Sequence, residues 1–183
     1  MGNYTVKSVD QLADLEIDVI LVNWNVKEWL PMNASMFRKT FRQSVFHFLS
    51  DPNGNILSLA RVNNDFPLQI QDKIYQFAEF VGFVSVEKQK GHGSSLLQEI
   101  SREAKRQGTQ LIGFCERQLR TFYTRNGMDL LTGKARSIFE QTNGEWTPST
   151  DDDIIVLNLS EQNRKLLNGL GEQCRAYFIS FHE

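Results

Sequence analysis

The middle of the chain carries an apolar run, a short glycine-containing turn and a helical pattern, and this order constrains the fold more than any other feature. The run at 77–86 is apolar enough to predict a buried strand. A helix is predicted over 94–107 because four apolar residues there have helical spacing. These residues are Leu96, Leu97, Ile100 and Ala104. The sequence therefore predicts a strand–turn–helix unit at its centre.

The turn between the strand and the helix is basic and contains a Gly-x-Gly pattern. Gly91 and Gly93 would let the backbone turn tightly and bring its N–H groups close to phosphate oxygens. The helix N-terminus carries partial positive charge, and Lys88 and Lys90 add full charges. The turn predicts a pyrophosphate site, although many strand-to-helix connections need glycine for geometry alone. The candidate binding residues are Lys88, Gln89, Lys90, Gly91, His92, Gly93 and Ser94.

Composition places the chain among single-domain proteins and excludes several partners. A length of 183 residues predicts one domain over 1–183 with room for a real core. A net charge of −2 argues against an obligate nucleic-acid partner. Cys115 and Cys174 are too far apart for metal-ligand spacing, so no metal site is predicted. No signal peptide or membrane-length apolar run occurs, which predicts a cytoplasmic protein without a membrane partner.

Hydrophobic periodicity and turn residues predict the remaining elements. Strands are expected at 4–8, 44–49, 56–62, 73–86, 111–114, 135–141, 154–159 and 176–181. Helices are expected at 10–30, 32–41 and 161–170. Asp51-Pro52-Asn53-Gly54-Asn55 predicts a hairpin turn, because Asn-Gly tolerates positive φ. Polar loops are expected at 63–72 and 142–153, and a bulge near Gly82.

Two segments resemble motifs of the GNAT acetyltransferases. The turn at 88–93 is similar to the basic-x-x-Gly-x-Gly pattern of that family, with Lys88 where Arg or Gln is usual. Segment 119–128, which contains Phe122-Tyr123 and Gly127-Met128, is similar to the family's Phe-Tyr-x-x-x-Gly-Phe block. The resemblance implies an α/β (α+β) fold with a mixed, mainly antiparallel sheet flanked by helices. It also implies acetyl-CoA as the cofactor.

The resemblance gives a role to the central strand and to one tyrosine. Backbone N–H groups around Val81 and Phe83 would bind pantetheine and the thioester oxygen of acetyl-CoA. Tyr123 stands where the family has a tyrosine that protonates the leaving thiolate, and a phenol holds its proton at neutral pH. The alternative for Tyr123 is a tyrosine packed under its helix.

Glu79 is the candidate base for the incoming ammonium group. It lies inside an apolar strand, where a carboxylate faces a cavity or is costly to bury. Desolvation would raise its pKa toward a value useful for a base. The alternative is a strand-edge glutamate paired with a nearby Lys or Arg.

A narrower resemblance concerns the acceptor. Segment 144–157 looks like the Thr-Pro, acidic run and strand of the aminoglycoside 2'-N-acetyltransferases, and Glu79 falls at that branch's proposed base. Asp151 and Asp152, with Glu79, would then bind a cationic amine, whereas the alternative is a solvated acidic loop. The chain departs from that branch at Cys174-Arg175-Ala176, because the branch has Cys-Asp-Trp at these positions. The substrate pockets are therefore expected to differ.

These features together predict an N-acetyltransferase that acts on a small, cationic, aminoglycoside-like amine by direct transfer in a ternary complex. A protein or peptide acceptor, and a non-catalytic acyl-CoA-binding module, are the alternatives. The late apolar strand also predicts a possible homodimer or, equally, an internal edge strand. Its apolar residues are Tyr177, Phe178, Ile179 and Phe181.

Overall fold

A computed structural model describes residues 2–179 of the chain. The chain forms two compact units, each made of two stretches of sequence. The first unit contains Met1–Asn64 and Phe80–Ile100, and the second contains Asp65–Glu79 and Ser101–Glu183. Three elements each begin in one unit and end in the other, namely β3 (Ile56–Ile70), β4 (Lys73–Ser85) and α3 (His92–Gln107).

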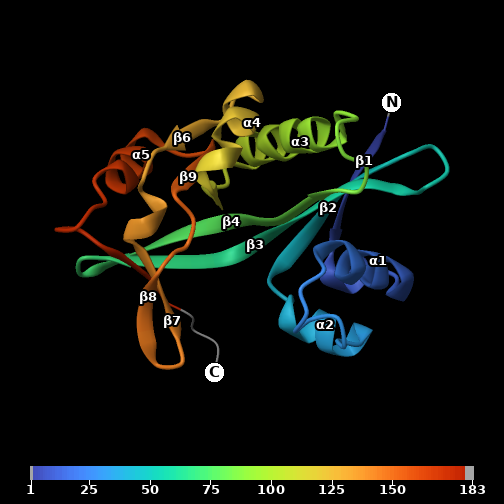
Figure 1. Ribbon diagram of the computed structural model, residues 1–183, viewed down its shortest axis with the longest axis horizontal. Coiled ribbons are helices and arrows are strands. Elements are labelled where there is room, and N and C mark those ends of the chain that lie inside the picture. Colours follow the sequence, from blue (N-terminus) through green and yellow to red (C-terminus); the bar gives the residue numbers. More distant parts are fainter. Residues whose placement is uncertain (1, 180–183) are drawn as a thin grey trace. The chain divides into compact units, whose positions relative to one another are not determined.

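The strands of the first unit form an antiparallel arrangement (Figure 1). β1 (Asn3–Ser8) pairs with β2 (Ser44–Ser50), which pairs with β3. The hairpin between β2 and β3 closes where Asp51 N–H donates to the Asn55 carbonyl at 2.9 Å. Gly54 has φ 87° in that turn, so the predicted Asn-Gly hairpin is confirmed.

An aromatic core lies between these strands and two helices, α1 (Asp14–Trp24) and α2 (Ala34–Thr40). A short 3-10 turn, η1 (Val9–Gln11), precedes α1. Phe37 and Phe46 are fully buried, and their ring centroids lie 5.5 Å apart. Burying such rings removes a large apolar area from water, which stabilises the unit.

The long helix predicted at 10–30 is wrong in its extent. The α-helix spans only Asp14–Trp24, because Asn25 adopts a left-handed conformation with φ 51° and ends it. Asn25 N–H still donates to the Leu21 carbonyl, at 3.0 Å. Three apolar residues of the predicted range, Leu15, Val22 and Leu30, are exposed.

The predicted helix at 32–41 is confirmed as α2, and its first turn is capped by Asn33. The Asn33 Oδ1 atom accepts a hydrogen bond from Met36 N–H at 2.9 Å. We expect Asn33→Ala to lower the free energy of unfolding by about 1 kcal/mol, because one helix N–H loses its partner. Asn33→Ser keeps a capping oxygen and should stay close to wild type in urea unfolding. Equal losses in both variants would contradict the cap.

The second unit is a mixed, mainly antiparallel sheet in the order β6-β9-β5-β4-β3-β10-β7-β8. β7 and β10 pair in parallel, whereas β3–β10, β5–β9, β6–β9 and β7–β8 are antiparallel. The strands are β5 (Leu111–Cys115), β6 (Asp129–Leu131), β7 (Ile138–Thr142), β8 (Glu145–Pro148), β9 (Asp153–Asn158) and β10 (Ala176–Phe178). The helices are α4 (Arg120–Arg125) and α5 (Glu161–Asn168), with 3-10 turns η2 (Arg117–Leu119) and η3 (Ala135–Ser137). The predicted α/β (α+β) fold class, with a mixed, mainly antiparallel sheet and helices, is confirmed (Figure 1).

Two predicted loops are strands instead. Residues 63–70 of the first loop continue β3, since Phe66, Leu68 and Ile70 alternate inward and are at most 2% exposed. The carbonyl of Pro67 takes part in the pairing, because it accepts a hydrogen bond from Ile179 N–H at 3.1 Å. The loop predicted at 142–153 contains β8, which forms a tight hairpin with β7.

Smaller differences concern the ends of predicted strands. The strand predicted at 135–141 begins at Ile138, because 135–137 form a 3-10 turn. The final strand is confirmed over Ala176–Phe178. Its predicted residues 180 and 181 lie outside the described residues. Among residues 2–179, none of the helices is long and apolar enough to span a membrane.

Candidate functional site

The predicted strand–turn–helix unit is present. β4 ends at Ser85, a turn follows, and α3 begins at His92, two residues before its predicted start. Gly91 adopts φ 79°, a conformation that side chains with a Cβ rarely adopt. Gln89 also has positive φ, at 61°. These two residues turn the chain sharply from the strand into the helix.

The start of α3 offers donors to an anion. The N–H groups in the first turn of a helix have no partners within that helix. Ser95 N–H donates to the Gly91 carbonyl at 3.0 Å, which leaves the preceding amides, those of His92, Gly93 and Ser94, at the helix end. Lys88 and Lys90 are exposed on the turn that leads into this end. The local charge and the helix dipole therefore both favour a phosphate group here.

Gly93 has a different role from Gly91. A Cβ atom at Gly93 would lie 3.1 Å from the Phe83 Cζ atom, a tighter approach than ordinary van der Waals contact. The first turn of α3 therefore packs directly on the Phe83 ring of β4. A side chain at Gly93 would press on the Phe83 ring, whereas one at Gly91 would be opposed by the positive φ of that residue.

The predicted irregularity of β4 occurs at Gly82. Its φ of 61° departs from the extended conformation of a strand. Its carbonyl accepts a hydrogen bond from Trp24 Nε1–H at 2.7 Å. The flanking residues Val81 and Phe83, predicted to bind the cofactor through their amides, are half-buried.

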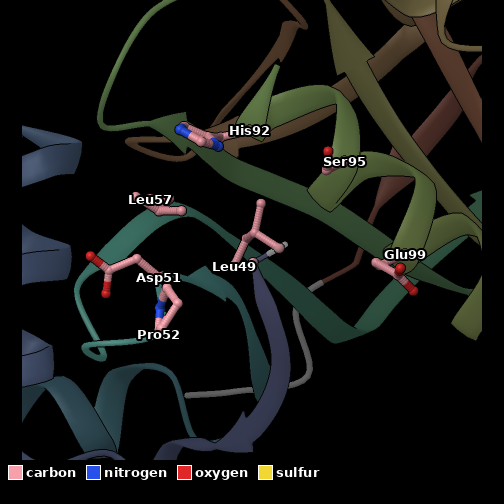
Figure 2. Close-up of a pocket in the computed structure, with 8 residues that line it drawn as sticks. Leu49, Asp51, Pro52, Leu57, His92, Ser95 and Glu99 are labelled. Atoms are coloured by element: carbon pink, nitrogen blue, oxygen red, sulfur yellow. The ribbon is translucent and has the colours of Figure 1, made fainter. Parts of the chain in front are cut away.

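A pocket of about 530 Å³ lies beside the start of α3 in the same unit (Figure 2). His92, Ser95 and Glu99 line it from the helix, and Asp51 and Pro52 line it from the β2–β3 hairpin. The pKa of Asp51 is lowered by hydrogen bonds from Asn55, so this carboxylate is ionised at neutral pH. Two carboxylates make the pocket unsuitable for phosphates. His92, the first residue of α3, is half-buried at this pocket.

Glu79 is half-buried near the end of the β4 segment that belongs to the second unit. The preceding residues Phe77 and Ala78 are buried in the sheet. Ala78 N–H donates to the Gln110 carbonyl at 2.9 Å, which ties this part of β4 to the start of β5. The carboxylate therefore extends from a part of β4 that is hydrogen-bonded to the neighbouring segment.

Tyr123 lies on α4 and is only 5% exposed. Its ring packs edge-on against Phe122, with centroids 5.1 Å apart. Among residues 2–179, its hydroxyl has no hydrogen-bond partner. Every fully buried side-chain oxygen or nitrogen in that range does have a hydrogen-bond partner. The hydroxyl oxygen is therefore not completely enclosed, although the residue as a whole is buried. Burial raises the pKa of Tyr123, so the phenol stays protonated at neutral pH.

Cys115 is an unreactive thiol at the end of β5. It is 2% exposed, and burial, followed by the nearby Asp153 charge, raises its pKa to about 12. A thiol is nucleophilic only as the thiolate, so Cys115 is inert at neutral pH. Within the described part of the chain, no group of three His, Cys, Asp or Glu side chains could hold a metal ion.

The acidic run at 151–153 is divided into different environments. Asp153 is fully buried, and its carboxylate accepts hydrogen bonds from the Arg120 guanidinium and, at 2.8 Å, from Gly133 N–H. Asp152 accepts from Arg117 N–H at 2.8 Å and forms an ion pair with Arg136. These hydrogen bonds lower the pKa of Asp152. Both carboxylates therefore fix the loop before β9.

Asp151 differs from its two neighbours. It is half-buried, and burial raises its pKa, with further contributions from the charges of Glu116 and Asp152. Its backbone N–H donates a hydrogen bond to the Ser149 hydroxyl at 3.2 Å. Asp151 and Asp152 are the residues of this run predicted to bind the acceptor amine. Of the two, Asp151 is the one whose ionised form a bound cation would stabilise more.

Sequence reasoning missed two residues that shape these sites. Trp24 contacts Gly82 although the two are 58 positions apart, and no local pattern signals such a contact. Arg120 is the partner of the buried Asp153. The signal for that pair was a carboxylate directly before the apolar strand 154–157, because a buried carboxylate needs a cation or several donors.

Comparisons with known proteins bear on the fold. No protein-family model matches the sequence, and no curated protein does. A GNAT family N-acetyltransferase from Escherichia coli, solved with CoA, has a TM-score of 0.60 at 12% identity, covering 99% of this chain and 93% of that chain. An acyl-CoA N-acyltransferase from Pseudomonas aeruginosa has 0.53 at 14% identity, covering 85% and 98%. Glucosamine-6-phosphate N-acetyltransferase from Arabidopsis thaliana has 0.51 at 13%, covering 69% and 92%. The chain therefore has the fold of the GNAT N-acetyltransferases.

Proposed function

We propose that the chain is an acetyl-CoA-dependent N-acetyltransferase that acts on the primary amine of a small cationic molecule. The observation that carries this proposal is the basic turn between β4 and α3, with Gly91 at positive φ and the helix amides directly after it. This turn occurs on a fold shared with N-acetyltransferases, one of which was solved with CoA. Fold alone does not define chemistry, so the proposal rests on the turn.

The residues of the turn fit the pyrophosphate of acetyl-CoA. A Cβ at Gly91 would meet no atom within 4 Å, so the space beside the turn is open. Lys88 and Lys90 neutralise the phosphates, and the amides of His92, Gly93 and Ser94 donate to them. Acetyl-CoA supplies an activated acetyl group, and Val81 and Phe83 would polarise its carbonyl through their N–H groups.

Two residues of the second unit are assigned to proton transfer. Tyr123 carries its proton at neutral pH, as a general acid for the leaving thiolate must. Glu79 accepts the proton of the incoming ammonium group, directly or through water. The inert Cys115 supports direct transfer of the acetyl group in a ternary complex, without an acyl-cysteine intermediate.

The acidic residues support a cationic acceptor. Asp151, Asp152 and Glu79 are the proposed substrate-binding residues, and Asp151 contributes most because Asp152 already pairs with Arg136. An ammonium group near Asp151 would stabilise its ionised form. An aminoglycoside-like polycation is complementary to the negative charge of these carboxylates. Acetyl transfer to peptides alone would indicate a peptide acceptor instead.

We expect Glu79→Gln to reduce turnover by about tenfold near pH 6 and by less near pH 8. The reason is that free amine is scarce at low pH, where a base is most needed. The measurement is a pH–rate profile at saturating acetyl-CoA. A profile parallel to that of wild type would remove Glu79 as the base.

We expect Gly91→Ala to weaken acetyl-CoA binding by about tenfold, because alanine opposes the positive φ that forms the turn. Gly108→Ala is the matched control, since Gly108 also has positive φ, at 69°, follows α3 and has open space around it. Calorimetric titration should show wild-type affinity for the control. Equal affinities in both variants would contradict the assigned phosphate site.

A screen of amines tests the proposal as a whole. Release of free CoA thiol is followed with aminoglycosides, polyamines, amino acids and short peptides as acceptors. We expect release with polycationic small molecules. Thiol release with peptides alone would mean that the acceptor is a peptide or protein and not a small cation. If no acceptor gives thiol release although acetyl-CoA binds, a non-catalytic acyl-CoA-binding module is favoured.

A further inference from the structure

Trp24 is held firmly at the end of α1. Asn25 ends the helix directly after it, so the last helical turn sets the position of its side chain. The indole is surrounded by aromatic rings, with Trp29 and Phe41 both at centroid distances of 5.5 Å. Phe37 stacks on it at 6.1 Å. These contacts leave the indole little freedom to turn.

The indole contacts Gly82 of β4 in two ways. Trp24 Nε1–H donates to the Gly82 carbonyl at 2.7 Å, the length of a strong hydrogen bond. A Cβ atom at Gly82 would lie 2.7 Å from the Nε1 atom and 2.8 Å from Cε2, so the indole edge rests directly on the glycine backbone. The contact therefore depends both on the Gly82 carbonyl as an acceptor and on the absence of a side chain at Gly82.

This hydrogen bond has a consequence for the next amide. The Gly82 carbonyl and the Phe83 N–H belong to one planar trans peptide, in which the two groups point in opposite directions. When the carbonyl is directed at Trp24, the Phe83 N–H is directed away from Trp24. The positive φ of Gly82, 61°, gives this peptide an orientation that a regular strand would not have.

We propose that Trp24 is a positioning residue that fixes the Gly82–Phe83 peptide so that the Phe83 N–H faces the thioester oxygen of bound acetyl-CoA. This inference rests on the proposed function, and it assigns the role to a residue far from β4 in sequence. Trp24 does not touch the acetyl group. It acts through the peptide that it holds, and its loss should alter carbonyl polarisation more than cofactor affinity.

The test uses acetyl-CoA labelled with ¹³C at the acetyl carbonyl, observed by NMR without an acceptor amine. In the wild-type protein we expect the carbonyl resonance to move downfield on binding, as it does when a carbonyl accepts a hydrogen bond. In Trp24→Phe, which keeps an aromatic ring but has no donor, at least half of this shift should be lost. Affinity should stay within about threefold of wild type, since the phosphate contacts are unchanged.

Trp29→Phe is the matched control, because Trp29 packs in the same aromatic cluster, with Phe41 at 5.3 Å. It should keep the full carbonyl shift. If Trp24→Phe does not fold, benzothienylalanine at position 24 replaces it, since it keeps the bicyclic shape and exchanges the N–H for sulfur. With an acceptor present, the donor-free variant should lose about tenfold in kcat with little change in KM.

The outcomes separate the two claims. A wild-type shift in the donor-free variant, or an equal loss in Trp29→Phe, overturns the role of Trp24 while leaving the proposed function intact. A wild-type protein that binds no acetyl-CoA overturns the proposed function and this inference with it. A wild-type protein that binds with no change in the carbonyl resonance overturns the inference alone.

Discussion

Tyr123→Phe is expected to reduce kcat by about two to three orders of magnitude, the usual contribution of a general acid. The substitution removes one oxygen and leaves the ring, which is buried and packs against Phe122. Without the hydroxyl, the thiolate of CoA must leave unprotonated or take its proton from water. The affinity for acetyl-CoA should not change, because the phosphate-binding turn is intact.

Steady-state kinetics with the best amine of the screen, together with calorimetric titration of acetyl-CoA, give this result directly. Tyr75→Phe is the control, since Tyr75 is a half-buried tyrosine packed on the core of the same unit. It should keep wild-type kcat. Equal kcat in wild type and Tyr123→Phe would return Tyr123 to a packing role under its helix.

Asp153→Asn is expected to lower the free energy of unfolding by about 3 kcal/mol, as when one partner of a buried ion pair is removed. The wild-type carboxylate is fully buried and is bound by Arg120 and Gly133. An amide offers one acceptor oxygen and an N–H₂ group that would face the guanidinium. Arg120 would then remain partly buried, at 30% exposure, without a counter-ion.

Urea unfolding measures this loss, and Asp129→Asn is the control. Asp129 forms a more exposed ion pair with Arg164, at 2.6 Å, and its loss should cost less than about 1 kcal/mol. Equal losses in the two variants would mean that the Arg120–Asp153 pair contributes no more to the free energy of unfolding than a surface ion pair does.

The stability difference between wild type and Asp153→Asn should depend on pH. Burial raises the pKa of Asp153, but hydrogen bonds from Arg120 and Gly133 outweigh it, so the folded-state pKa lies below the usual value. The stabilisation is present above the unfolded pKa, about 3.9, and is lost as pH falls through the folded pKa. The difference should be constant near neutrality and shrink only in acid.

The elements that the sequence predicted well are those defined by local patterns. The β4–turn–α3 unit needs only an apolar run, a glycine and helical spacing. The same local rule would have found the β7–β8 hairpin, since Asn143 and Gly144 both have positive φ, at 53° and 84°.

The features that could not be predicted depend on contacts between distant parts of the chain. β3 extends through 63–70 because its apolar residues enter the core of the second unit, despite Asn63, Asn64 and Pro67. The different environments of Asp151 and Asp152 depend on Arg117 and Arg136 from other elements. The sequence identified the acidic run, whereas only the structure distinguishes carboxylates that hold the loop from one suited to a cation.

The most direct test of the central claim is mass spectrometry of amine acceptors after incubation with the protein and acetyl-CoA carrying a ¹³C-labelled acetyl group. The acceptors are an aminoglycoside, a polyamine and a short peptide in one mixture. The account predicts that the label appears on an amine of a small cationic acceptor, and that Tyr123→Phe slows its appearance strongly. Unlabelled acceptors, with labelled acetyl-CoA bound but intact, would contradict the account.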